Sequence, residues 1–288
     1  MNFLSTMDTL YTTKLTLPSF SWPLGGVICY LVIIFGLQEI MKKYEPFKFK
    51  WLLFVHNMAL MYFSLGLVIG ISHSLISLLR SGYSMYDLYC GGDTLLNNPH
   101  AIALYNWCYL FYASKYYEFF DTLFLVLKKK PLSFLHVYHH ASVVLICWLA
   151  LHDEITMVNY FSFFFYIYIY IIFEEFISNT YFIKQGWITC YNNALVHVIM
   201  YDYYGMQSIN VTRPWKKSVT TLQIIQFITD GWTSLPFLYF YYTEYKCFGT
   251  MRAWFLGNCV GLSFLLLFVN FYKKNYSKTS VLPQKKKS

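Results

Sequence analysis

The chain has 288 residues, of which 57% are hydrophobic and only 12% are charged. A soluble domain carries about twice this fraction of charged residues, so the composition predicts an integral membrane protein. The formal net charge of +8 does not indicate a nucleic-acid-binding protein, because the lysines lie in short blocks between apolar runs. The seven cysteines have no CxxC spacing, and we therefore predict no metal site.

Seven apolar runs are long enough to cross a membrane as helices. They cover residues 22–41, 51–79, 101–127, 132–151, 187–206, 219–242 and 251–272. Residues 1–21 are mixed and polar and predict a lead-in rather than a signal peptide, and 273–288 form a basic tail. The predicted fold is an all-α membrane protein whose seven transmembrane helices form one domain from 22 to 272.

Basic residues predict the orientation of these helices. Most of the 22 lysines and arginines follow the first, third, fifth and seventh runs. Because positive loops stay in the cytosol, the N-terminus is predicted to be lumenal and the C-terminus cytosolic.

The stretch 158–185 is an atypical insert built mostly of Phe, Tyr and Ile. As an eighth crossing it would move the later basic blocks to the lumen, against the charge rule. Two hypotheses stay open. One is a translated intron, and the other is a genuine insertion that lies as a re-entrant or surface helix outside the seven-helix body.

Residues 136–140 read His-Val-Tyr-His-His at the start of the fourth run. On a helix, His136, His139 and His140 share one face. Imidazole can act as base, acid, nucleophile or metal ligand, and ionisable groups at a membrane boundary are costly and usually functional. We therefore predict a catalytic cluster, over the alternative of a hydrogen-bonded polar patch at a helix end.

The third run places Lys115, Glu118 and Asp121 at three-residue spacing, with Thr122 beside them. A cation and two carboxylates then share one helix face. Two roles remain open: an ion-pair ladder that fixes helix packing, or carboxylates that position catalytic histidines.

Two later runs carry polar stripes of their own. The stripes comprise Asn193, His197, Met200, Tyr201 and Tyr204 in the fifth run and Thr220, Gln223 and Gln226 in the sixth. A single such helix is usually explained by contacts between helices. Several striped helices are better explained as the walls of one buried cavity, to which His56 and Asn57 of the second run would add.

Four stretches, 115–122, 134–140, 193–204 and 215–227, together resemble the membrane fatty-acid elongase family, the very-long-chain 3-oxoacyl-CoA synthases. The resemblance covers about residues 25–275. It implies seven helices in the endoplasmic reticulum around a buried acyl cavity. It also implies condensation of a long-chain acyl-CoA with malonyl-CoA to a 3-oxoacyl-CoA two carbons longer, with release of CO2 and CoA.

The residues suit this chemistry without a further cofactor. No motif cysteine can accept the acyl group, so His139 or His197 is predicted to carry it as an acyl-imidazole, with Glu118 and Asp121 orienting the other histidines. The rival is direct attack by the malonyl enolate, with histidine only as base. Five basic residues on the cytosolic side could hold CoA phosphates or merely set the topology: Lys128, Lys129, Lys130, Lys216 and Lys217.

The resemblance carries several further expectations. Pro131 stands where the polyunsaturated branch tends to have glutamine, which favours saturated or monounsaturated chains. His140 and His197 are 57 residues apart, and without the 28-residue insert they would be 57 − 28 = 29 apart, close to the usual spacing in the family. The predicted partners are membrane lipid and the reductases and dehydratase of the elongation cycle. A homodimer stays open, and no nucleic acid is expected.

The ends of the chain and the loops add two predictions. Lys285 and Lys286 match a dilysine retrieval signal for the endoplasmic reticulum. Cys90 and Cys247 lie in two loops predicted to be lumenal, where an oxidising compartment permits a bridge, as in some elongases. Two free thiols are the alternative.

Two other functions compete with this interpretation. Membrane di-iron desaturases and hydroxylases also carry HxxHH boxes, but need several, and this chain has one. A seven-helix transporter or receptor explains the number of runs but not the histidine cluster.

Overall fold

The computed structural model describes residues 10–91, 95, 97–152, 186–243, 247 and 250–276, and all the regular elements in these ranges are helices. In chain order they are α2 (Ser21–Met41), α3 (Lys50–Arg80), α4 (Met85–Cys90), α5 (Pro99–Tyr117), α6 (Phe119–Leu127), α7 (Phe134–His152), α9 (Gly186–Ser208), α10 (Lys216–Ser234), α11 (Pro236–Tyr242) and α12 (Met251–Tyr276). The predicted all-α class is confirmed for these residues.

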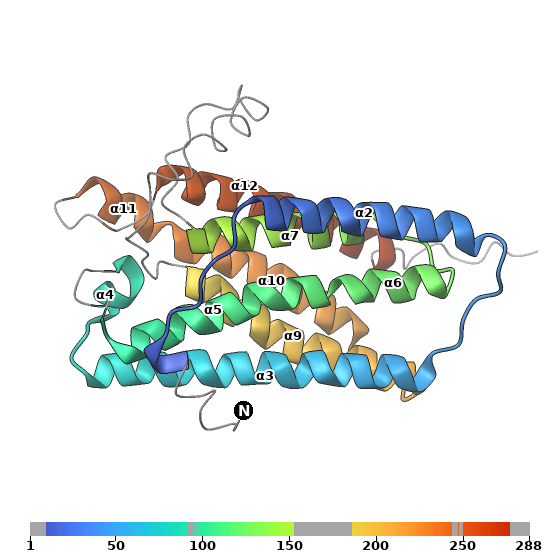
Figure 1. Cartoon of the computed structure of the whole chain (residues 1–288), viewed down its shortest axis with the longest axis horizontal. Helices are drawn as coiled ribbons and strands as arrows, with labels where there is room; N and C mark the ends of the chain where they lie inside the picture. Colours follow the sequence, from blue (N-terminus) through green and yellow to red (C-terminus); the bar gives the residue numbers. More distant parts are fainter. Residues whose placement is uncertain are drawn as a thin grey trace, which may run out of the picture.

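The long helices run roughly along one axis (Figure 1), and their contacts close into a ring. Around the ring, α3 packs against α9, α9 against α10, α10 against α12, α12 against α7, α7 against α5, and α5 again against α3. Helix α2 lies outside the ring, against α6 and α7. The short helices α4 and α11 lie at one end of the bundle (Figure 1).

Two of the predicted runs are divided into two helices each. In the run 101–127, α5 ends at Tyr117 and α6 begins at Phe119, with Glu118 between them. The N–H of Glu118 still donates to the carbonyl of Ser114 at 2.9 Å, so the chain bends there without a loop. In the run 219–242, the division falls before Pro236, because proline has no N–H to continue the helical hydrogen bonds.

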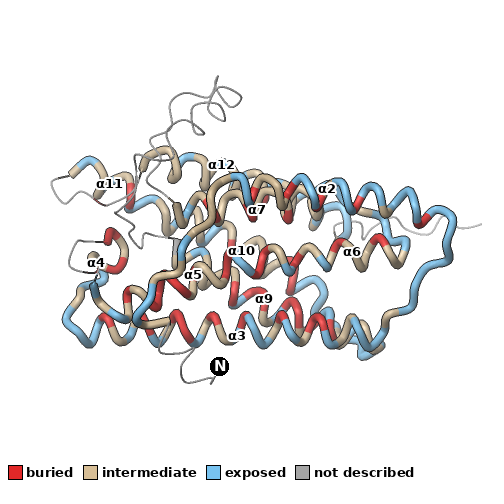
Figure 2. Tube along the Cα trace, in the orientation of Figure 1, coloured by how far each residue is buried: buried red, intermediate tan, exposed pale blue. Residues whose placement is uncertain are grey.

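The outer surface of the bundle is apolar. Val32, Val55 and Leu266 are all more than 60% exposed, and Figure 2 shows the exposed outer faces of α2 and α3. In the described part of the chain, four helices are long and apolar enough to cross a membrane: α2, α3, α7 and α12. The prediction of a multi-pass membrane protein is thereby confirmed, whereas the count of seven crossings stays a prediction.

The described part of the N-terminal lead-in is fixed to the bundle by a buried asparagine. The Asn106 side chain donates to the carbonyls of Leu10 and Thr13 at 2.8 Å, and it accepts from the N–H of Leu15 at 2.9 Å. Further along, the Trp148 indole donates to the carbonyl of Pro18 at 2.8 Å. Residues 10–20 are thus bonded to α5 and α7, and Figure 1 shows this segment passing from beside α3 to the start of α2.

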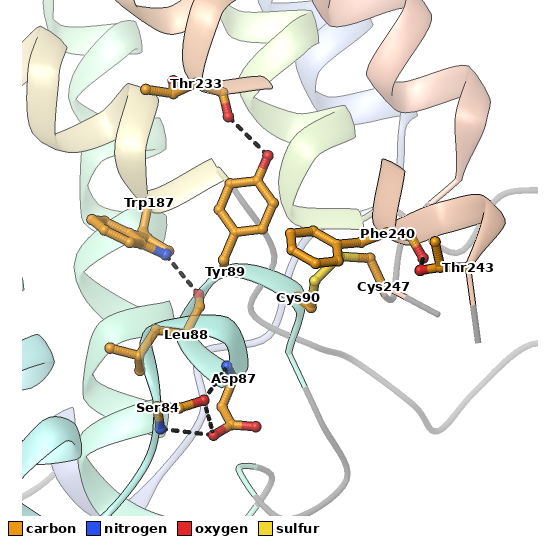
Figure 3. Close-up of a disulfide and its surroundings, with 10 residues drawn as sticks. All are labelled: Ser84, Asp87, Leu88, Tyr89, Cys90, Trp187, Thr233, Phe240, Thr243 and Cys247. Carbon is orange, nitrogen blue, oxygen red and sulfur yellow. Dashed lines mark hydrogen bonds between the residues drawn. A yellow bond between two sulfur atoms is a disulfide. The ribbon is translucent and has the colours of Figure 1, made fainter. Parts of the chain in front are cut away.

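Figure 3 shows the disulfide between Cys90 and Cys247, whose Cα atoms are 4.4 Å apart. Next to it, the Tyr89 hydroxyl donates to the carbonyl of Thr233 at 2.8 Å. The Trp187 indole donates to the carbonyl of Leu88 at 2.9 Å. Of the two alternatives left open by the sequence, the structure has the bridge, which joins α4 to the segment between α11 and α12.

Some predictions fall on residues that the structure does not describe. The insert 158–185 and the retrieval lysines Lys285 and Lys286 lie outside the described residues. The basic tail 273–288 is described only as far as residue 276, where α12 ends.

Candidate active site

The three motif histidines lie together on α7, as their spacing predicts. The ring centroids of His136 and His140 are 4.5 Å apart, and those of His139 and His140 are 5.6 Å apart. Nε2 of His136 is hydrogen-bonded to Oγ1 of Thr122 at 2.9 Å. Thr122 is in turn hydrogen-bonded to the Tyr30 hydroxyl at 2.9 Å, so the orientation of the His136 ring is set from α6 and α2.

A buried ion pair lies at the bend between α5 and α6. Lys115 and Glu118 are 3% and 2% exposed, and Nζ lies 2.7 Å from Oε1. The same ammonium donates to Oδ1 of Asn193 at 3.0 Å and lies 4.0 Å from the centre of the Phe111 ring. Oε1 of Glu118 is also 3.5 Å from Nδ1 of His197 on α9. The bend therefore brings one cation and one carboxylate against the polar stripe of α9.

Asp121 has partners on two other helices. Its Oδ1 lies 2.7 Å from Nε2 of His56 on α3, and its Oδ2 accepts from the Tyr201 hydroxyl on α9 at 2.8 Å. Each carboxylate thus has a histidine partner, but neither partner belongs to the motif on α7. Sequence reasoning placed His56 near the site without its partner, because the two residues are 65 positions apart.

The stripes of α9 and α10 face each other. Asn193 Nδ2 donates to Oε1 of Gln226 at 3.4 Å, and Gln223 Nε2 donates to Sδ of Met200 at 3.2 Å. Thr220 is buried near them. The predicted polar faces of both helices therefore meet inside the ring.

Two cavities open along these faces. The polar cavity has a volume of about 600 Å³, and its walls include the three motif histidines, His56, Asn57, Glu118, Asp121, His197, Tyr201, Tyr204, Thr220 and Gln223. The apolar cavity, of about 620 Å³, is lined mostly by apolar side chains of α5, α7, α9, α10 and α12. Four side chains line both: His139, Asn193, Gln226 and Phe227. We call this place the junction.

His139 stands out among the residues of the junction. It is packed against Phe264, with ring centroids 4.8 Å apart, and its Nδ1 has no hydrogen-bond partner among the described residues. A buried polar atom without a partner is costly unless a ligand satisfies it. Among the described residues, His139 is therefore the histidine that a molecule occupying both cavities would contact.

Only some of the five predicted CoA-binding lysines lie at the polar cavity. Lys128, Lys130 and Lys216 line the polar cavity. Lys129 is not part of its wall, and the Lys217 ammonium lies 5.7 Å from the centre of the Tyr272 ring. Three of the five predicted CoA-binding lysines thus lie where a charged molecule in the polar cavity could reach them.

The profile of the GNS1/SUR4 family (ELO) matches residues 15–182 and 166–286. The chain belongs to this fatty-acid elongase family. Fatty acid elongase A of Dictyostelium discoideum is 32% identical over 277 residues, which cover 92% of this chain and 88% of that protein. Fatty acid elongase sre1 of the same organism is 29% identical over 268 residues, with coverages of 92% and 87%.

The likeness extends to animals. Very long chain fatty acid elongase 4 of Homo sapiens is 28% identical over 265 residues, covering 89% of this elongase and 72% of the human protein. The predicted family is confirmed, and with it the reaction class: the protein is a condensing enzyme of fatty-acid elongation. The desaturase, hydroxylase, transporter and receptor alternatives are thereby set aside.

Proposed function

We propose that this elongase condenses acyl-CoA with malonyl-CoA at the junction. The acyl chain would occupy the apolar cavity, and CoA would occupy the polar cavity with its phosphates near Lys128, Lys130 and Lys216. The observation that carries this proposal is that His139 lines both cavities, where the thioester of a molecule spanning them would lie.

His139 is the proposed acyl acceptor. Its imidazole attacks the thioester carbonyl, the C–S bond breaks, and CoA leaves as the thiol with a proton from a neighbouring imidazole. Malonyl-CoA then loses CO2, and the enolate carbon attacks the acyl-imidazole. The new C–C bond forms as the C–N bond breaks, which regenerates His139 and releases 3-oxoacyl-CoA.

His197 is the proposed proton carrier. The carboxylate of Glu118, 3.5 Å from Nδ1, favours a proton on that nitrogen and leaves Nε2 as the base. Asp121 would act on His56 in the same way, at 2.7 Å from its Nε2. His136 and His140 complete the imidazole cluster beside the thioester.

Rapid quenching without malonyl-CoA tests the acyl-enzyme. The wild type should release free CoA in a burst of about one equivalent, and His139→Ala should abolish it. His197→Ala should slow the burst while leaving a trapped acyl group on His139. His73→Gln is a matched control, because His73 lies outside both cavities and bonds to Tyr11. Normal condensation without any burst would instead support direct attack by the enolate.

The apolar cavity would set the acyl chain. Pro131 supports saturated or monounsaturated chains, and Trp254, held by a 2.8 Å bond from its indole to the carbonyl of Ser234, is part of the cavity wall. Defined acyl-CoAs offered to the purified enzyme would establish the preferred class. Trp254→Ala should extend the products by about two to four carbons if this wall limits chain length, whereas Trp51→Ala on the outer face of α3 should not.

The proposed topology has seven crossings: α2, α3, α5 with α6, α7, α9, α10 with α11, and α12. The basic polar cavity would face the cytosol, and the disulfide would face the lumen of the endoplasmic reticulum. The Asn210 sequon lies in the loop between α9 and α10 and should then stay unglycosylated. An endoglycosidase-sensitive mobility shift would contradict this orientation.

The insert 158–185 is proposed to lie outside this plan, either as a translated intron or as a surface-lying insertion. The two stretches that match the family profile overlap at 166–182, inside the insert, which supports an interruption there. Sequencing the mature transcript separates the two: codons present in every messenger would refute the intron. Lys285 and Lys286 are proposed to retrieve the enzyme to the endoplasmic reticulum, together with its cycle partners.

A further inference from the structure

Asp230 on α10 is a carboxylate in the wall of the apolar cavity, and the reaction described above does not use it. An acidic group facing an acyl chain is costly unless its oxygens are hydrogen-bonded. Asp230 satisfies them with two amides. Asn192 Nδ2 donates to Oδ1 at 2.8 Å, and Gln226 Nε2 donates to Oδ2 at 3.3 Å.

Asp230 is one end of a continuous series of hydrogen bonds. At the other end, Lys115 Nζ donates to Oδ1 of Asn193 at 3.0 Å. Asn193 Nδ2 then donates to Oε1 of Gln226 at 3.4 Å, and Gln226 Nε2 donates to Asp230. We call these four residues the amide ladder. It connects the buried ion pair to the apolar cavity through the junction.

The chemistry of the two ends sets the direction of the ladder. An ammonium can only donate, so Asn193 must turn its oxygen to Lys115 and its NH2 group to Gln226. A carboxylate accepts, so Gln226 must turn its NH2 group to Asp230. Amide orientation is often ambiguous, but here a cation and an anion at opposite ends require one arrangement.

Each amide nitrogen has a second hydrogen that the ladder does not use. Asn193 and Gln226 line both cavities together with His139, so their amide groups border the place of the proposed thioester. Negative charge develops on the thioester carbonyl oxygen when a nucleophile attacks, and preoriented donors stabilise it. The junction thus has two amide groups whose remaining hydrogens are available to such an oxygen.

We propose that Asn193 and Gln226 form the hydrogen-bond site for the thioester carbonyl oxygen, and that Lys115 and Asp230 are positioning residues that keep both amides turned toward it. The proposal rests on the condensation assigned above. Asp230 acts only through Gln226, and it serves neither as a base nor as a contact that selects chain length.

Steady-state kinetics with the purified full-length enzyme tests the coupling. Gln226→Leu removes a donor and should lower kcat by about 10²-fold. Asp230→Leu should lower kcat at least 10-fold with little change in KM for acyl-CoA. The double variant should have the same kcat as Gln226→Leu alone, because Asp230 acts only by orienting the Gln226 amide. Thr233→Val, which leaves the ladder and both cavities intact, should keep the activity of the wild type.

Multiplicative losses in the double variant, or an Asp230→Leu effect confined to KM and product length, would overturn the proposal.

A second measurement does not depend on turnover. A ketone analogue of acyl-CoA, with CH2 in place of sulfur and a 13C-labelled carbonyl, reports hydrogen bonding through its infrared band. Binding to the wild type should shift this band to lower frequency, and Gln226→Leu and Asp230→Leu should reduce the shift.

The two readouts separate this proposal from the condensation itself. An unshifted carbonyl band in the wild type, or the same band in all three proteins, would refute the donor site even if condensation is normal. A shifted band in a protein that makes no 3-oxoacyl-CoA would refute the proposed reaction while retaining the site.

Discussion

Neutralising Glu118 should destabilise the protein more than removing the whole ion pair. Glu118→Gln leaves the Lys115 ammonium 3% exposed, with the Asn193 oxygen and the Phe111 ring as its neutral partners. Breaking a buried pair by changing one partner costs about 3–5 kcal/mol, because an uncompensated charge stays in a medium of low dielectric constant. For a chain of this size, that cost lowers Tm by roughly 10 °C.

The double variant Lys115→Met with Glu118→Gln removes both charges and keeps a side chain of similar volume. It should recover most of the lost stability, because neither desolvated charge remains. Tryptophan fluorescence during thermal unfolding in detergent measures both effects. Glu39→Gln is the matched control: its partner Lys42 is also on the surface, and exposed pairs contribute little. A double variant less stable than Glu118→Gln would refute the reasoning, as would a single variant with the Tm of the wild type.

Two further predictions concern packing and the disulfide. A methyl group at Gly70 would overlap the Trp107 ring, so Gly70→Ala should cost about 1–3 kcal/mol of stability and separate α3 from α5. Gly66→Ala should be neutral, because the added methyl group would have no neighbouring side chain within 4 Å. The difference in Tm between the two variants decides this. Cys247→Ser should remove about 2–5 kcal/mol of stability and abolish the mobility difference between oxidised and reduced protein in gels. The control Cys29→Ser changes an exposed free cysteine and should affect neither. Equal Tm values for the two variants would contradict a structural bridge.

Patterns within one helix were predictable from the sequence, because they depend only on helical geometry. The common face of Asn193, His197 and Tyr201 is an example, and so is the clustering of the motif histidines. Partners on different helices were not predictable from spacing. The bond between His56 and Asp121 depends on how α3 lies against the bend between α5 and α6.

Single residues without a pattern were also missed. Asp230 is one acid in an apolar run, and nothing in its neighbours along the chain indicates the amides that hold it. The hydropathy of α9 and α10 is lowered by the polar stripes that build the site, and that of α5 by its five tyrosines with Asn106 and Lys115. That explains why α2, α3, α7 and α12 alone qualify as spans by hydropathy in the described part of the chain.

The bridge between Cys90 and Cys247 has a consequence for biosynthesis. The two cysteines are 157 residues apart, and only α12 and the tail follow the second one. During translation the Cys90 thiol can therefore form the disulfide only after nearly all the other helices have been synthesised. A chain whose later helices entered the membrane in the opposite orientation would leave the two thiols on different sides, unable to meet. In the proposed topology, with both cysteines in the lumen, formation of this disulfide therefore indicates that the later helices of that molecule were inserted in the correct orientation.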